Sequence, residues 1–249
     1  MNTLTKMEKN APSAYIRWSL NERVQHWSLA SSFILLVITG FALKYPDSWW
    51  VTPISGVDWL FDLRGLIHRI CGAVFLGLGV YHAAYMFGSH RGRQLVSAFR
   101  PGLKDLQDAA QNISYNLGFS KHPPQFSHFS YMEKAEYLAL IWGAVIMGAT
   151  GLMLWFENTT LRFFPKWTID LVTVIHLYEA WLATLAIVVW HLYYVIINPD
   201  VYPLNTSMVN GKLTEKEMRD EYFLEWEALQ KSDGETTVAE ESERETKEK

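Results

Sequence analysis

The chain has 249 residues, of which 49% are hydrophobic and only 19% are charged, and its formal net charge is −4. The single cysteine, Cys71, excludes an internal disulfide framework, a cysteine-ligated iron–sulfur cluster and covalent haem attachment through a CxxCH motif. The mean hydropathy of −0.01 averages apolar stretches with polar ends, which is typical of a small polytopic membrane protein.

The N-terminal part of the chain predicts a polar segment followed by a membrane span. No apolar run precedes a small-residue cleavage site in residues 1–23, so we expect no cleavable signal peptide. The first span is predicted over about 24–44, with His26 near its start. Residues 47–64 are rich in Trp and acids and are expected to form a short surface loop.

The second predicted span, about 65–87, contains two histidines, His68 and His82, which are fourteen residues apart. At a rise of about 1.5 Å per residue the two rings would lie about 21 Å apart along the helix axis, within about 40° of one face. The span therefore places two imidazoles on one side at two depths.

A long connection and a third span follow. Residues 88–133 form a basic loop, and the apolar residues between Leu103 and Leu117 recur at spacings of three and four, which predicts a surface helix. The third span is predicted over about 134–156. It has no histidine, but it has Gly143, Gly148 and Gly151, which favour close packing against a neighbour.

The fourth predicted span, about 171–197, again contains two histidines. His176 and His191 are fifteen residues apart, or about 22 Å along the axis and about 60° in azimuth. Beyond this span residues 198–249 form a polar tail, and we expect its end to be disordered.

Two spans with two histidines each, at matching depths, predict two haems, each with one axial imidazole from each helix. Imidazole is poorly suited to hydrocarbon without a partner, and a satisfied core histidine explains one such residue better than four at matched spacing. The predicted fold class is therefore all-α, a polytopic four-helix membrane bundle with two b-type haems between the helices.

Basic residues indicate the orientation of the spans. Lys and Arg concentrate in the N-terminal segment and in the loop 88–133, so both termini should be cytoplasmic. His68 and His176 are then the only pair at the outer depth. Three histidines, His26, His82 and His191, compete for the two inner axial positions, and spacing alone leaves this choice open.

The histidine motifs resemble those of the cytochrome b (gamma) subunits of respiratory formate dehydrogenases, and also the cytochromes b of thiosulfate reductase and nickel–iron hydrogenase. The likeness covers the four spans and the polar C-terminal extension. Its motifs are Arg23-Val24-Gln25-His26-Trp27, Leu66-Ile67-His68-Arg69, Ile175-His176 and Trp190-His191-Leu192-Tyr193. This resemblance implies that His26 pairs with His191 and His68 with His176.

The chain departs from this family pattern at two places. His82 is additional, and its spacing from His68 is similar to that in the second helix of cytochrome b6, where both histidines bind haem. We favour His26 as the inner ligand and expect the other histidine to hydrogen-bond a haem propionate or a quinone. The Asn-Ala-Gly segment near the quinone of formate dehydrogenase gamma subunits is replaced here by Tyr131-Met132-Glu133-Lys134.

Four residues are candidates for quinone binding or proton exchange. Tyr131, Glu133 and Glu136 cluster at the cytoplasmic start of the third span, whereas Glu179 lies in the outer half of the fourth. An acid within a span is costly and usually functional, although charges at a helix start are ordinary. By resemblance to the formate dehydrogenase subunits, we expect the quinone on the cytoplasmic side.

The predicted function is electron transfer between the quinone pool (menaquinone or ubiquinone) and a partner subunit with iron–sulfur or multihaem c-type centres. The chain would be a quinone-reactive subunit in a bacterial-type inner membrane, not a stand-alone enzyme, because it has no nucleotide-binding motif and no nucleophile set. No nucleic-acid partner is expected. The alternative is a non-redox transporter or assembly module that binds metal or protons, but neither the internal repeats nor the broken helices of transporters are evident.

Overall fold

The computed structural model describes residues 14–55, 57–199 and 201–232. Its regular structure is almost entirely helical, and four of the described helical segments are long and apolar enough to cross a membrane. These segments are Leu20–Lys44, Asp62–Gly88, Tyr131–Trp155 and Trp167–Ile197. The predicted all-α class is thus confirmed, and these four candidate membrane helices begin and end within a few residues of the predicted spans.

The chain divides into two compact units. The first, called here the membrane unit, comprises residues 20–96 and 136–205. The second, called the polar unit, comprises the described parts of residues 1–19, 97–135 and 206–249.

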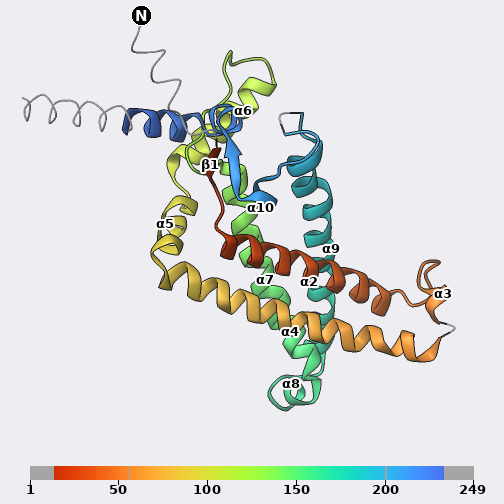
Figure 1. The fold of residues 1–249 in the computed structure, drawn as a ribbon. Helices are drawn as coiled ribbons and strands as arrows, with labels where there is room; N and C mark the ends of the chain where they lie inside the picture. Colours follow the sequence, from red (N-terminus) through yellow and green to blue (C-terminus); the bar gives the residue numbers. More distant parts are fainter. Residues whose placement is uncertain (1–13, 56, 200, 233–249) are drawn as a thin grey trace, which may run out of the picture. The chain divides into compact units, whose positions relative to one another are not determined.

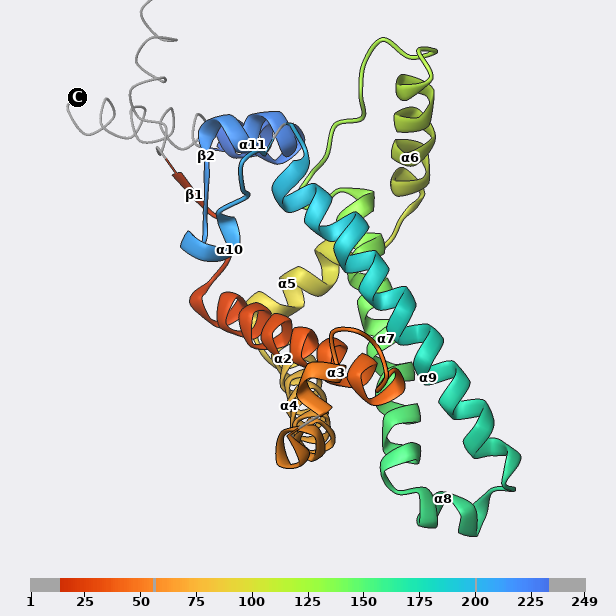
Figure 2. The same cartoon turned by 90° about the vertical axis from the view of Figure 1, so that its right-hand side faces the viewer.

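The membrane unit is built from two helical hairpins. In the first hairpin α2 (Leu20–Lys44) and α4 (Asp58–Gly88) pack side by side, joined by a turn that contains α3 (Thr52–Ser55) (Figures 1 and 2). The second hairpin consists of α7 (Tyr131–Trp155) and α9 (Trp167–Leu185), joined by the short helix α8 (Glu157–Phe163). Helix α5 (His90–Phe99) follows the first hairpin.

The fourth span changes its helical type near its end. After α9 the chain continues as two π-helical segments, η1 (Ala186–His191) and η2 (Tyr193–Ile197). A π-helical turn holds one more residue than an α-helical turn, so it shifts the register of every side chain that follows. His191, the last residue of η1, takes its position from this shift.

Large apolar side chains are exposed on all four long helices of the membrane unit. Examples are Val80 on α4 at 72%, Trp142 on α7 at 67% and Val189 in η1 at 67%. Apolar surface of this extent would be unfavourable in water and is the expected outer face of a bundle solvated by lipid.

The polar unit brings together three segments that the sequence analysis treated separately. Strand β1 (Ala14–Ile16) pairs antiparallel with β2 (Lys212–Thr214), and the unit also holds α6 (Leu103–Asn116), α10 (Ser207–Asn210) and α11 (Glu215–Glu221). Helix α6 lies within the stretch predicted to be a surface helix. The part of the tail expected to be disordered, after residue 232, lies outside the described residues.

A buried arginine ties the polar unit together. Arg17 is 3% exposed, its guanidinium lies 4.1 Å from the ring centroid of Tyr222, and it forms ion pairs with Glu133 at 3.6 Å and Glu225 at 3.4 Å. Tyr222 donates its hydroxyl to Glu133 at 2.8 Å. Burial and the neighbouring Glu133 carboxylate raise the pKa of Tyr222 well above its usual value of 10. A buried charge with several partners is costly to remove, so this cluster should hold the three segments in one arrangement.

Candidate functional site

Four histidines of the membrane unit form two pairs, and each pair joins one hairpin to the other. The ring centroids of His68 on α4 and His176 on α9 lie 6.4 Å apart. Those of His26 on α2 and His191 in η1 lie 6.3 Å apart. We call these the outer pair and the inner pair, respectively.

The separation within each pair matches two imidazoles on a single metal. An imidazole nitrogen lies about 1.1 Å from its ring centroid and binds a transition metal at about 2.0 Å, so two opposed ligands place their centroids about 6.2 Å apart. The described residues contain no cluster of three or more His, Cys, Asp or Glu suited to an ion. A donor set of two imidazoles suits an iron whose other four ligands come from a porphyrin, whereas protein-bound zinc takes three or four side chains.

Two threonines set the protonation of the outer pair. Thr39 on α2 donates its hydroxyl to the carbonyl of Leu35 at 2.6 Å and lies 3.0 Å from Nδ1 of His68. Because that hydroxyl hydrogen is already used, Thr39 Oγ1 accepts the Nδ1 proton of His68. The Nε2 of His68 is then unprotonated, which is the form that binds a metal.

The second half of the outer pair repeats this arrangement. Thr150 on α7 donates to the carbonyl of Ile146 at 2.7 Å and lies 2.8 Å from Nδ1 of His176. Both outer imidazoles are therefore oriented by a threonine of the preceding long helix, with Nε2 available to a ligand.

Two glycines make room for the outer rings. A Cβ atom on Gly40 would lie 3.0 Å from Cε1 of His68, and one on Gly151 would lie 3.3 Å from Cε1 of His176. Each glycine directly follows the threonine that orients the same ring. The Thr-Gly pair thus positions the histidine by a hydrogen bond and by close packing.

The inner pair has a different environment. Oε2 of Glu136 on α7 lies 3.3 Å from Nδ1 of His191. Among the described residues, Glu136 Oε1 and His26 Nδ1 are buried atoms with no hydrogen-bond partner. Buried polar atoms without partners are uncommon in folded proteins and indicate that a further group belongs there.

The fifth candidate ligand, His82, does not face another histidine. Its Nδ1 lies 2.8 Å from Oε1 of Gln25 on α2, and its Nε2 lies 2.8 Å from the hydroxyl of Tyr137 on α7. Protein side chains therefore occupy both of its nitrogens. The structure brings His26, and not His82, to the partner position of His191.

The polar contacts of the two hairpins correspond to one another. A spacing of 111 residues relates Gln25 to Glu136, His26 to Tyr137, Thr39 to Thr150, and Gly40 to Gly151. The histidine-bearing helices correspond as well, with His68 matching His176 and His82 matching His191. This correspondence lies in a few polar positions of the two hairpins.

The proposed quinone residues fall in different surroundings. In the polar unit, the hydroxyl of Tyr131 accepts from Asn112 at 2.8 Å, and Glu133 accepts from the Ser130 amide at 2.7 Å in a helix-capping arrangement. In the membrane unit, Glu136 contacts His191, while Oε1 of Glu179 would lie 2.9 Å from a Cβ on Gly143. Of these four residues, Glu136 is the one that contacts a paired histidine, His191.

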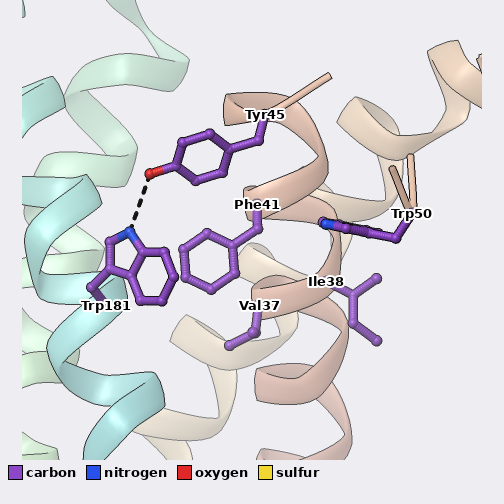
Figure 3. Close-up of a pocket in the computed structure, with 6 residues that line it drawn as sticks. All are labelled: Val37, Ile38, Phe41, Tyr45, Trp50 and Trp181. Atoms are coloured by element: carbon purple, nitrogen blue, oxygen red, sulfur yellow. Dashed lines mark hydrogen bonds between the residues drawn. The ribbon is translucent and has the colours of Figure 1, made fainter. Parts of the chain in front are cut away.

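The membrane unit also has an apolar pocket of about 350 Å³ between α2 and α9 (Figure 3). Phe41 and Trp181 lie 4.5 Å apart between ring centroids, and the Trp181 indole donates to the Tyr45 hydroxyl at 3.2 Å. The other lining residues are Val37, Ile38 and Trp50. Since none of the six is a carboxylate or a histidine, the pocket suits an apolar group better than proton exchange.

Sequence reasoning missed the residues that orient the histidines. Thr39 and Thr150 look like ordinary small residues within apolar spans, and Gln25 lies next to a more conspicuous histidine. The signal that was available is the Thr-Gly dipeptide, which occurs in the first and third spans fourteen residues after Gln25 and Glu136.

Comparison with known proteins identifies a family and several similar proteins. A family profile described as prokaryotic cytochrome b561 matches residues 17–211. The chain is 25% identical over 157 residues to the formate dehydrogenase cytochrome b556 subunit of Haemophilus influenzae. This match covers 61% of the chain and 59% of that protein. It is 22% identical over 178 residues to the formate dehydrogenase cytochrome b556(fdo) subunit of Escherichia coli K12, covering 66% and 78%. The resemblance drawn from the histidine motifs is confirmed by these matches.

Proposed function

Because the chain belongs to the prokaryotic cytochrome b561 family, we propose that it is the membrane cytochrome b subunit of a respiratory oxidoreductase complex and that it holds two haems b. His26 and His191 would hold the inner haem, and His68 and His176 the outer one. The chain would pass electrons between the quinone pool and a partner redox subunit. It would thus be the quinone-reactive subunit of a larger complex.

The observation that carries this proposal is the matched separation of the two histidine pairs, 6.3 and 6.4 Å between ring centroids. Each bound haem would supply a centre that gains and loses one electron. The offset of fifteen positions from His176 to His191 corresponds to about 22 Å along the helix axis, so the two centres would lie at two depths of one membrane.

The protein's own residues would prepare each ligand for metal binding. Thr39 and Thr150 accept hydrogen bonds from the protonated Nδ1 atoms of the outer imidazoles, which leaves the Nε2 atoms unprotonated. Glu136 does the same for His191, with a carboxylate in place of a hydroxyl. Such partners of metal-bound histidines fix the ring orientation and raise ligand basicity.

The remaining expectations belong to the same proposal. We infer that both termini are cytoplasmic, that the quinone, menaquinone or ubiquinone, binds on that side, and that the partner subunit carries iron–sulfur or multihaem c-type centres. The relatives in Haemophilus influenzae and Escherichia coli are named as formate dehydrogenase subunits. Formate oxidation on a partner is accordingly the first activity to test.

The proposal is tested by optical spectra of the purified membrane protein and of its outer-pair variants. The wild type should show a reduced b-type band, with two haems per chain by pyridine haemochrome assay. His68→Ala and His176→Ala should each lose one haem and keep the other spectrally intact. A colourless wild type would favour the non-redox alternative, and two haems in both variants would refute the ligand assignment.

A further inference from the structure

We infer that helix α6 of the polar unit pairs with the same helix of a second copy of the chain. The helix carries a narrow stripe of apolar side chains that is exposed on the surface of that unit. Pairing would join two copies through their polar units. It does not depend on haem binding, so it stands or falls separately from the proposed function.

The spacing of the apolar stripe is that of a seam between two helices. The stripe consists of Leu103, Leu106, Ala110, Ile113 and Leu117, at successive spacings of three, four, three and four residues. Its four large side chains are between 60% and 79% exposed. At about 100° per residue the five positions lie within about 80° of the helix surface. A helix that packs on a broad surface usually has an apolar face of about 100° or more, whereas the narrower three-four repeat fits one facing helix.

The opposite face of α6 is fixed to its own unit by polar contacts. Asp105 pairs with Lys134 at 2.8 Å, and Asn112 donates to the Tyr131 hydroxyl at 2.8 Å. Asp108 is buried on the same face. Polar side chains normally face solvent on a surface helix, so the arrangement here is reversed. These contacts hold the helix in place with the stripe outward, which lowers the entropy cost of pairing.

The residues that flank the stripe favour a second copy over a different partner. In a two-helix seam the flanking positions set the choice of partner, usually through charged pairs. Here they are Ala109 and Asn116 on one side and Gln107 and Ser114 on the other, and all four are uncharged. Two identical helices therefore meet without like-charge repulsion, and the flanks do not select a helix of opposite charge.

The stripe is also nearly symmetric about its centre. Leu103 and Leu117 lie seven residues on either side of Ala110, and Leu106 and Ile113 lie four and three residues from it. A two-fold contact uses the same patch on both copies. Ala110 would thus face its own counterpart in a parallel or an antiparallel pair, and its small side chain allows the helices to approach closely.

A common membrane compensates for the small size of this contact. Two short helices bury less than the roughly 800 Å² per partner of a stable interface between soluble proteins. Two copies in one bilayer are confined together, which raises their effective concentration. We therefore expect the dimer in membranes and its loss on dilution in detergent.

The first test is crosslinking of the full chain in native membranes. The one native cysteine is removed by Cys71→Ser, and a single new one is introduced by Ala110→Cys. A short bismaleimide should then join most of the chains into dimers. Tyr115→Cys is the matched control, because this exposed position lies on the same helix about 140° from Ala110. It should yield less than about a tenth as much dimer, since it points away from the seam.

The second test changes the charge of the stripe. Leu106→Lys combined with Ile113→Lys, in the Ala110→Cys chain, places like charges opposite one another and should lower the dimer yield at least about tenfold. The same two changes to Glu should have the same effect. Coexpression of the Lys and Glu chains with different tags should restore crosslinking between them. Because both positions are exposed, the circular dichroism of these variants should match that of the parent.

Four results would overturn the pairing. The absence of dimers with Ala110→Cys would exclude contact between the two helices, and equal yields with Tyr115→Cys would indicate random encounters. Crosslinking of Ala110→Cys to another protein and not to itself would assign the stripe to a different subunit. An unchanged dimer yield in the folded Lys and Glu variants would place the stripe outside the interface.

Discussion

The two hairpins of the membrane unit orient their histidines with the same residue types at the outer end and with different residues at the inner end. At the outer end both hairpins use a Thr-Gly pair against a histidine, with nearly equal hydrogen bonds of 3.0 and 2.8 Å. At the inner end the first hairpin sets the neutral Gln25 against His82, whereas the second sets the carboxylate of Glu136 against His191.

The repeat therefore keeps the contacts of the outer histidines and changes those at the inner level. The outer pair contains one histidine from each hairpin in equivalent positions, so the two halves contribute alike. The inner level has two equivalent positions, and only the His26–His191 position has two imidazoles. The other position has a phenol, which closes it to metal and leaves a proton-sharing pair.

The π-helical segment η1 compensates for the one-residue difference in histidine spacing between α4 and the fourth span. His68 and His82 are fourteen residues apart in a regular helix, whereas His176 and His191 are fifteen apart with η1 between them. A π-helical turn absorbs one inserted residue, so His191 returns to nearly the azimuth that His82 has on α4. Functional positions are common places for such turns.

The largest expected effect comes from the inner histidines. His26→Ala should abolish the inner haem, because it would remove one of the two proposed axial ligands, while His82→Ala should keep both haems. Haem content and low-temperature spectra of the two variants check this. The reverse result would mean that His82 is the ligand and that the comparison of hairpins assigns the inner level wrongly.

Next in size are the glycines beside the outer rings. Gly40→Ala should displace His68, since the new Cβ would lie 3.0 Å from Cε1, and should cost roughly 1–3 kcal/mol of stability with partial loss of the outer haem. In Gly151→Ala the new Cβ would lie 3.3 Å from Cε1 of His176, so the loss of stability should be less than half as large. Thermal unfolding of both variants, followed at the haem band, gives the comparison. Equal effects would show that the rings are not held by these contacts.

The threonines should have smaller and nearly equal effects. Thr39→Val or Thr150→Val removes the acceptor for a ligand's Nδ1 proton and should weaken outer-haem binding by about 10- to 100-fold. Thr→Ser at each position keeps the hydroxyl and should restore binding. Haem titration of the apoprotein measures both. Failure of serine to rescue would indicate that the methyl group, not the hydrogen bond, matters.

The smallest effect concerns the inner carboxylate. Glu136→Gln makes the second hairpin like the first and removes a negative charge near His191, so the inner-haem potential should rise by on the order of 50 mV. Glu179→Gln is the control, because Glu179 packs against Gly143 instead. Redox titration of each variant checks the shift. An equal rise in both variants would rule out a specific role of the Glu136–His191 contact.

Much of this architecture could be predicted because it depends on local pattern. The four spans follow from apolar runs of about twenty residues, and the depth of each histidine follows from the helical rise. The outer pair, His68 with His176, was predicted as the only pair at its depth, and the structure places these two rings together.

The polar unit could not be predicted in this way. Its sheet joins residues almost two hundred positions apart, and Arg17 finds its acidic partners in two distant segments. Such contacts depend on chain topology, which short-range periodicity does not encode.

By itself the sequence determined the number of spans, the helical class and the depths of the histidines, because hydropathy and helical geometry act over short distances. Only the tertiary structure decided which of His26 and His82 lies opposite His191, since that choice depends on how two hairpins are placed around each other. It also decided that Gln25, Thr39, Thr150 and Tyr137 orient the imidazoles. A hydrogen bond across helices requires matched azimuth on both, and neither helix alone contains that information.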